Sequence, residues 1–241
     1  MTSITLYGGA NEIGGNKILL EDKGVRLFFD FGQSFNIYEG YGFEYLSPRD
    51  RMGLLDYFEF NFLPKLEGIY SETMLDKCRE PKYLNPKIHG VFISHCHSDH
   101  INHIRFLDPK IPMYVGHGTK MIMDISKQTS PRYNDFGKEG HDYRLFKTND
   151  KIKVKHITVE PIHVDHSIPG AYGFIIHTSK GAIIYTGDLR MHGPKGSMTK
   201  EFIKRAKEAN PIAMLSEGTR VMDVDPEKPN IELSDDYTTS Q

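Results

Sequence analysis

The residues GVFISHCHSDH, numbers 90–100, decide the fold class of this chain. An apolar run, GVFIS, leads directly into a stretch in which His95, His97 and Asp99 alternate with other residues. The run predicts a buried strand, and alternation in extended chain puts those three side chains on one side. His95 and His97 can then meet one cation, while Asp99 and the adjacent His100 turn toward a second position. Imidazole and carboxylate are both good zinc ligands, so the stretch predicts a metal site at the end of a strand.

Two residues from distant parts of the sequence are expected to complete this site. His166 follows the apolar run 157–162, and Asp188 follows a Thr-Gly pair at the end of the run 182–186. A carboxylate at a strand's C-terminal edge can bridge two cations about 3.5–4 Å apart, and such a pair activates a shared hydroxide. Zinc is the expected cation and manganese is compatible, because ligand type narrows the metal without fixing it.

Strand-like and helix-like segments are interspersed along the chain, which predicts a layered α/β (α+β) architecture. Short apolar runs between turns predict strands over residues 4–7, 17–21, 25–30, 90–94, 112–115, 152–154, 157–162, 172–178, 182–186 and 212–216. Helices are expected over residues 52–62, 100–107, 119–127 and 198–209, with Asp99 as the cap of the second. Residues 128–143 are polar and rich in turn formers, so they are expected to be irregular.

Two segments differ in character from the rest. Residues 33–87 are rich in aromatic side chains and longer than an ordinary connection, which indicates an insertion with its own structure. This insertion is either a helical pair packed on the core or a lid over a site. Residues 221–241 are acidic and polar, which indicates a linker or a frayed tail. We therefore expect one main domain over residues 1–220.

Composition excludes some classes of function. With 241 residues and a net charge of −2, the chain cannot bind nucleic acid through overall positive charge, although a local basic patch is compatible. No apolar run approaches the ~18 residues of a membrane span, and the first residues lack signal-peptide character. Two cysteines make no disulfide framework. A cytoplasmic protein without membrane contact is expected.

The joint pattern resembles the metallo-β-lactamase superfamily and, within it, the β-CASP nucleases of the ribonuclease J type. The resemblance covers about residues 3–220 and rests on GGANEIGGN at 8–16, FFDFG around Asp30, HCHSDH at 95–100, DHSIPGAYG around His166, TGD at Asp188 and SEGTR around Glu217. It implies an αββα sandwich with metals at one edge of the paired sheets. RNA is the substrate that it implies, with a metal-bound hydroxide attacking phosphorus.

The resemblance also implies roles for single residues. Six would hold the metals: His95, His97 and His166 one zinc, Asp99 and His100 the other, and Asp188 both. Asp99 and Asp188 would thereby act in catalysis. Asp30 would support the metal loop from behind, and Glu217 matches the acidic residue at which the β-CASP domain begins.

Two further histidines near the expected site each have two interpretations. His163, three residues before His166, hydrogen-bonds nearby backbone or substitutes as a ligand. His192, which follows Asp188 in RMHGPKGS, is a plain loop residue or touches the scissile group during catalysis. The sequence leaves both alternatives open.

The chain departs from the family pattern in having no histidine after His192 and in its long aromatic segment 33–87. The last histidine ligand of the family is then missing, the sandwich is expected to be incomplete at its C-terminal side, and a β-CASP domain would begin at 221–241. Three functions stay open: a zinc-dependent phosphodiesterase acting on RNA, a hydrolase of a lactone, thioester or cyclic phosphate, and a lapsed metal-binding scaffold. A homo-oligomer is compatible with each.

Overall fold

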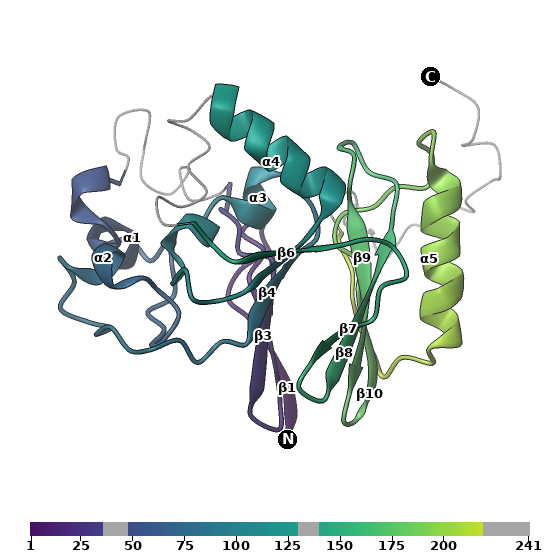
Figure 1. Ribbon diagram of the computed structural model, residues 1–241, viewed down its shortest axis with the longest axis horizontal. Helices are drawn as coiled ribbons and strands as arrows, with labels where there is room; N and C mark the ends of the chain where they lie inside the picture. The colour runs from purple at the N-terminus through teal and green to yellow at the C-terminus, as the bar shows by residue number, and fades with distance from the viewer. Residues whose placement is uncertain (36–47, 130–139, 219–241) are drawn as a thin grey trace, which may run out of the picture.

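The computed structural model describes residues 1–35, 48–129 and 140–218. Two β-sheets pack face to face, and helices cover the outer face of each sheet, which gives four layers (Figure 1). This is the α+β layered architecture of the metallo-β-lactamase fold that the sequence predicts. The expected tail, residues 221–241, and residues 36–47 of the expected insertion lie outside the described ranges.

The first sheet has six strands in chain order, β1 to β6. The strands β1, β2 and β3 are antiparallel, whereas β3, β4, β5 and β6 are mutually parallel. Their bounds are Thr2–Leu6, Ile18–Asp22, Val25–Phe29, Gly90–Ile93, Met113–Gly116 and Tyr143–Phe146. Because β1 rises from the N-terminus at the bottom of Figure 1, β3 and β4 also end at the top edge.

The second sheet has five strands in the order β11-β10-β9-β8-β7. Only the β10–β11 pair is parallel among the described strands of this sheet. The bounds of β7 to β11 are Ile152–Val154, Ile157–His163, Tyr172–Thr178, Gly181–Tyr185 and Ala213–Leu215. The carboxyl ends of β8 and β10 therefore lie at the same edge of this sheet, one strand apart.

The core between the sheets follows from the two-residue period of strand side chains. In β3, Leu27 and Phe29 face the second sheet, while Phe28 faces the outer layer. Phe29 lies against Phe92 of β4 and Phe174 of β9, with ring centroids 5.5 and 5.7 Å apart. Aromatic side chains from both sheets thus fill the interface, and this packing sets the position of one sheet against the other.

Two long helices, α4 and α5, and two short ones, α1 and α2, cover the outer faces of the two sheets. Of the long helices, α4 (His117–Thr129) packs on the first sheet through Met123, and α5 (Gly196–Glu208) packs on the second through Phe202. The described part of the expected insertion, residues 48–87, contains α1 (Leu55–Glu59) and α2 (Glu72–Leu75). Its apolar side chains join the outer core of the first sheet. Figure 1 shows α1 and α2 at the left, beside this sheet.

Three local predictions are wrong. Residues 100–107 do not form one helix: α3 is Ser98–Ile101, and a separate 3-10 turn covers Ile104–Phe106. The helix breaks because the backbone N–H of His103 donates to the Phe31 carbonyl at 3.1 Å instead of continuing the turn. Asp99 lies inside α3 and does not cap it.

The helix expected at 52–62 is also wrong in its bounds, whereas most of the irregular segment expected at 128–143, residues 130–139, lies outside the described ranges. Only Leu55–Glu59 is α-helical in the first. The end of the second opens β6 (Tyr143–Phe146), in which only Phe146 is buried. An edge strand forms through backbone pairing with its neighbour and needs little apolar pattern, so the sequence carries a weak signal for β6.

None of the helices in the described ranges has the length and the apolar character needed to span a membrane.

At the bottom of the molecule, the buried carboxylate of Asp22 joins the two sheets. It accepts hydrogen bonds from the Thr2 hydroxyl at 2.7 Å, from the backbone N–H and hydroxyl of Ser179 at 2.8 Å each, and from the His156 ring at 2.9 Å. Burial alone would raise the pKa of Asp22, but these hydrogen bonds outweigh burial and hold the pKa well below its ordinary value. The ionised form is therefore part of the folded state.

Replacing Asp22 by Asn should lower the free energy of unfolding by about 2–4 kcal/mol at pH 7, because buried donors lose a charged acceptor. The folded-state pKa lies below the unfolded value of about 3.9, so this stabilisation is present above pH ~4 and is lost as the pH falls below it. Urea unfolding at several pH values measures both effects. Asp142→Asn, at an exposed ion pair with Arg144, is the control and should change stability little.

Candidate metal centre

The loops that follow β4, β8 and β10 bring the expected site residues together at the top edge of the sheets. His95, His97 and His100 follow β4, His166 follows β8, and Asp188 follows β10. Their side chains form two groups in which the candidate ligand atoms lie within 4.8 Å of one another: His95, His97, His166 and Asp188 in one, and Asp99, His100 and Asp188 in the other.

The first group is built from three converging imidazole nitrogens. The Nδ1 atom of His97 lies 3.0 Å from Nε2 of His95 and 3.1 Å from Nε2 of His166. Burial lowers the pKa of all three, most strongly that of His95, so the rings are neutral. Three neutral nitrogens facing one point are the donor set of a structural or catalytic zinc site. These residues therefore fit a divalent cation.

The second group surrounds the buried ring of His100 with carboxylates. Its Nε2 atom lies 3.3 Å from Oδ2 of Asp99 and 3.2 Å from Oδ1 of Asp188. Burial alone would lower the pKa of His100, but Asp30 and these carboxylates outweigh burial and raise it well above its ordinary value. The group thus holds an excess of negative charge that a cation would neutralise, so these residues fit one as well.

Asp188 belongs to both groups because its two oxygens point in different directions. Oδ1 lies 3.2 Å from His100, whereas Oδ2 lies 3.7 Å from Nε2 of His166 and 3.9 Å from Nε2 of His95. Burial would raise the pKa of this carboxyl, but the hydrogen bond from His100 and the nearby histidines hold it below the ordinary value. An ionised carboxylate with one oxygen toward each group has the geometry of a bridge between two cations.

Behind the ligands, Asp30 fixes the ring of His100. It is fully buried at the end of β3 with φ of 58°, a left-handed conformation that few residues other than glycine adopt. Its Oδ2 accepts hydrogen bonds from Nδ1 of His100 at 2.7 Å, the Ser94 hydroxyl at 2.7 Å and the Tyr185 hydroxyl at 2.6 Å, and its Oδ1 accepts the Ser94 N–H at 2.7 Å. Because Nδ1 faces Asp30, Nε2 of His100 is the atom presented to a cation.

The backbone next to Asp30 runs directly along the metal loop. Phe31 donates to the His100 carbonyl at 2.8 Å, and Gln33 donates to the Ser98 carbonyl at 3.1 Å. A Cβ added at Gly32 would lie 1.7 Å from the Asp99 carbonyl oxygen, so no side chain fits there. The FFDFG segment thus acts as a backbone support for the loop.

Asp165, which directly precedes His166 in the sequence, holds the His166 loop in place through its hydrogen bonds. The buried Asp165 carboxylate accepts from Nε of Arg190 at 3.2 Å and from the N–H of Lys195 at 2.9 Å. Its own N–H donates to the Thr199 hydroxyl of α5 at 2.9 Å. The loop of His166 is therefore tied to the loop that carries Asp188. Sequence reasoning missed Ser94, Asp165 and Tyr185, whose only signal is adjacency to a candidate ligand.

Three other predicted site residues lie outside the two groups. His163 bonds the Thr148 hydroxyl at 2.6 Å and stacks on Tyr172, so its ring does not reach the converging nitrogens. His192 is exposed in the segment before α5. Glu217 lies at the rim, where its Oε1 accepts from the Leu189 N–H at 3.3 Å.

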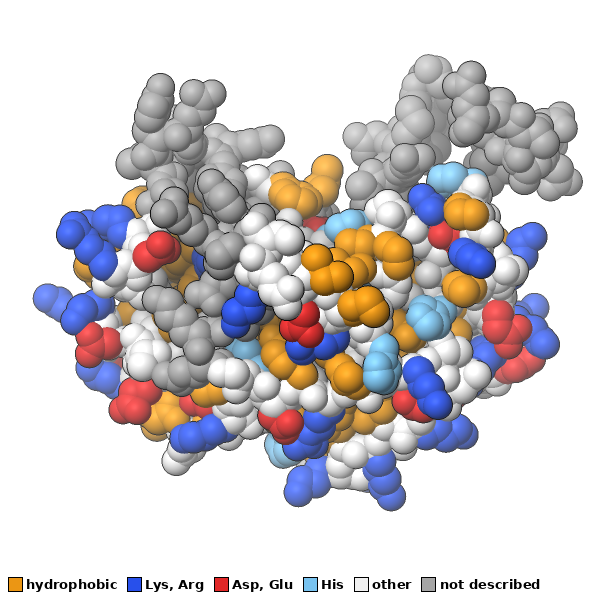
Figure 2. Space-filling view, turned by 45° about the horizontal axis from the view of Figure 1, so that its top comes forward, with side chains coloured by type: hydrophobic (Ala, Val, Ile, Leu, Met, Phe, Trp, Pro, Cys, Tyr) orange, Lys and Arg blue, Asp and Glu red, His pale blue; other side chains and the backbone are white. Residues whose placement is uncertain are grey.

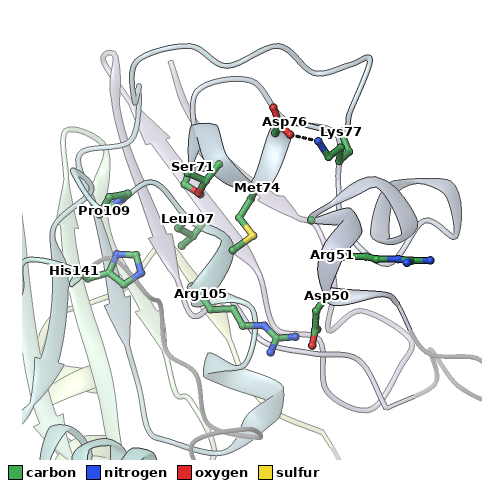
Figure 3. A pocket seen from close by; sticks show the side chains of 12 residues that line it. Asp50, Arg51, Ser71, Met74, Asp76, Lys77, Arg105, Leu107, Pro109 and His141 are labelled. Carbon is green, nitrogen blue, oxygen red and sulfur yellow. Dashed lines mark hydrogen bonds and ion pairs between the residues drawn. The ribbon is translucent and has the colours of Figure 1, made fainter.

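A cavity of about 780 Å³ opens onto the second group. It is lined by residues of the glycine-rich segment 8–16, by Asp99 and Asp188, and by residues 214–218, which include Glu217. A smaller cavity of about 290 Å³ lies beneath the described part of the insertion, around Met74, Arg105 and His141 (Figure 3). None of the candidate ligands lines the smaller cavity. The larger cavity is therefore the candidate substrate site.

Asp30→Asn should weaken zinc binding at the position of His100 about 10–100-fold, because the amide no longer holds Nδ1 as a charged acceptor. Competition titration of chelator-treated protein measures the change. Asp108→Asn, at another buried carboxylate, which accepts from Tyr83 at 3.0 Å, is the matched control and should bind zinc as the wild type does. Equal weakening in both variants would contradict a specific role for Asp30.

Comparison with known proteins agrees with this architecture. The sequence profile described as "Beta-lactamase superfamily domain" matches residues 68–221. Ribonuclease J of Helicobacter pylori (strain ATCC 700392 / 26695) is 26% identical over 223 residues, which is 90% of this chain and 27% of that protein. Ribonuclease J of Pyrococcus abyssi is 26% identical over 235 residues, which is 92% of this chain and 46% of that protein.

A solved structure is also similar to this chain. The crystal structure of a protein of unknown function from Enterococcus faecalis V583 aligns with a TM-score of 0.67 at 30% identity and covers 85% of this chain. The chain spans 27% to 47% of the lengths of these three relatives. On the family match, the fold and the sequence similarity together, the chain belongs to the metallo-β-lactamase superfamily and is similar to the N-terminal portion of ribonuclease J.

Proposed function

We propose that this chain carries the two-cation centre of a phosphodiesterase that cleaves RNA. The superfamily supports a metal-dependent hydrolase, and the ribonuclease J relatives support RNA as the substrate. The observation that carries the proposal is the Asp188 carboxylate, which presents Oδ1 to one group of ligands and Oδ2 to the other. Zinc is the cation that we propose, and manganese is compatible with the same donors.

In this proposal the residues divide into three tasks. His95, His97 and His166 would hold one cation through neutral nitrogens, and Asp99 and His100 would hold the second. Asp188 would contribute one carboxylate oxygen to each. When bound, the cations supply an activated hydroxide and stabilise the negative charge that gathers on the phosphoryl oxygens.

In this proposal, other residues around the site orient the candidate ligands and do not themselves bind a cation. Asp30 and Ser94 prevent the His100 ring from turning, so its Nε2 stays directed at the carboxylates of Asp99 and Asp188. Burial raises the pKa of Tyr185 well above its ordinary value, so its hydroxyl stays a donor to Asp30. We propose that Glu217 orients the Asp188 loop through the Leu189 N–H. Contact of His192 with the scissile group stays a prediction.

On the face that Figure 2 shows, the described Lys and Arg side chains do not form a continuous basic track, which favours substrate binding at the metals. In Figure 2, Lys and Arg side chains lie scattered among acidic ones around a central group of hydrophobic side chains. Nucleic-acid binding by charge alone needs clustered basic residues. We therefore infer that cations and cavity walls supply most of the contact between this chain and a phosphodiester.

The size of the cavity favours a second candidate function. Small-molecule sites commonly have volumes of about 300–1,000 Å³, and the cavity beside Asp99 and Asp188, of about 780 Å³, falls within that range. A lactone, thioester or cyclic phosphate could be hydrolysed there with the same ligands. Parallel assays on 5′-phosphorylated RNA and on lactone and thioester panels separate the two candidates. Stoichiometric metal with no turnover on any substrate would favour the scaffold alternative.

Asp188→Ala should reduce RNA hydrolysis by about 10³-fold or more, because it removes the carboxylate shared by both cations. Single-turnover cleavage of labelled RNA measures the rate. Asp124→Ala, at an exposed ion pair with Lys120, is the control and should leave the rate unchanged. Full activity of Asp188→Ala would rule out a mechanism that depends on a bridged pair of cations.

A further inference from the structure

A fourth polar side chain reaches the group of Asp99, His100 and Asp188, and it comes from the glycine-rich segment. Nδ2 of Asn16 lies 3.2 Å from Nε2 of His100. The two carboxylate oxygens nearest to the same Nε2 atom lie at 3.3 and 3.2 Å. Three polar atoms from three parts of the chain thus surround His100 Nε2 at nearly equal distance, and Asn16 lines the same cavity as the two carboxylates.

These distances are those expected between ligands of one cation. Metal–ligand bonds of about 2.0–2.2 Å in a tetrahedron put neighbouring ligand atoms roughly 3.3–3.6 Å apart. Asn16, Asp99 and Asp188 all approach His100 close to that spacing. A hydrogen bond explains one such contact, but it does not explain why an amide and two carboxylates converge on the same nitrogen.

The backbone of Asn16 is held on both sides, so its side chain stays at this position. Its N–H donates to the Asp99 carbonyl at 3.1 Å, and its carbonyl accepts from the Gly32 N–H at 2.9 Å. Oδ1 of Asn16 lies against Gly9, where an added Cβ would come within 2.5 Å of it. Nδ2 also lies 3.5 Å from the Asp99 carbonyl oxygen, and the residue is half-buried, so the amide can turn about its χ2 bond while the backbone stays in place.

That rotation decides which atom faces His100. The two ends of an amide have nearly the same shape, so a half-turn exchanges Nδ2 and Oδ1 without moving the backbone. When Nδ1 carries the proton that faces Asp30, Nε2 is unprotonated and accepts a hydrogen bond from Nδ2, whereas a cation on Nε2 repels Nδ2 and attracts the carbonyl oxygen. Asparagine carbonyl oxygens are established ligands of hard divalent cations.

We propose that Asn16 is a ligand of the cation held by Asp99, His100 and Asp188, and that it binds through Oδ1. This inference rests on the two-cation centre proposed above and adds to it a ligand from a segment without histidine or acidic ligands. The second position then has three oxygen donors and one nitrogen, whereas the first has three nitrogens and one oxygen, Oδ2 of Asp188. Oxygen donors favour manganese more than imidazoles do, so the two positions differ in metal preference.

Calorimetric titration of the chelator-treated chain with Mn²⁺, and separately with Zn²⁺, tests the proposal. The wild type should bind two equivalents. Asn16→Ala should bind the first equivalent unchanged and the second about 10-fold or more weakly. Asn16→Asp keeps an oxygen and adds charge, so it should bind the second equivalent at least as tightly as the wild type. Asn85→Ala, at an exposed position that lines neither of the two cavities described, is the control and should behave as the wild type.

The variants also separate ligation from hydrogen bonding. If Asn16→Asp binds the second equivalent as weakly as Asn16→Ala, the amide acts as a donor and the proposal is overturned. Unchanged affinity in Asn16→Ala overturns it too, and the two-cation centre then stands without Asn16. A wild type that binds one equivalent or none overturns the centre itself. Thermal melting verifies that each variant is folded, and if Asn16→Ala is not, Asn16→Asp alone decides between tighter and weaker binding.

Discussion

The buried carboxylate of Asp30 is the interaction on which the rest of this structure depends. A charge without solvent is costly unless it is paired and hydrogen-bonded, and Asp30 draws its partners from β4, β10 and the metal loop. Satisfying that one group fixes the loop after β4 against both sheets. It also fixes the ring of His100, since a second orientation would leave the carboxylate without its charged partner. The hydrogen bonds that satisfy the buried Asp30 carboxylate in the folded protein thus also orient His100, a candidate ligand.

The site is assembled from backbone as much as from side chains. Gly32 permits the segment after β3 to touch the metal loop, and the hydrogen bonds of Phe31 and Gln33 run along it. Aromatic packing of Phe29 and Phe92 against Phe174 then sets the distance between the sheets, and with it the distance from His95 to Asp188. At the opposite end, Asp22 closes the sandwich through Thr2, His156 and Ser179. Two buried aspartates therefore hold the two ends of one interface, with the candidate chemistry at one of them.

Sequence patterns predicted most strands because their apolar runs are short and bounded by turns. The strands around Val91 and Phe174 are buried on both faces, and such runs give a strong signal. The pattern failed where tertiary contacts override local preference. The helix expected from His100 breaks at His103, whose N–H bonds to Phe31 instead, and β6 pairs at a sheet edge with little apolar burial. The candidate ligands were identified by residue type and spacing, whereas Tyr185 and Asn16 carry no such signature because they lie far from the HCHSDH motif in the sequence.

The sequence by itself determined the layered fold class, the end of the strand at which cations would bind and the six candidate ligand residues. The first two follow from short-range order, namely apolar runs and alternation in extended chain. The set of six ligands also rests on the resemblance to the metallo-β-lactamase superfamily, because His166 and Asp188 lie far from the HCHSDH motif in the sequence. Only the tertiary structure decided which atoms converge. That Asp188 divides its oxygens between two groups, that His163 turns to Thr148 and away from the ligands, and that Asn16 reaches His100 depend on packing between segments 15 to 88 residues apart. Distances between such segments are set by the filling of the core, which no local pattern encodes.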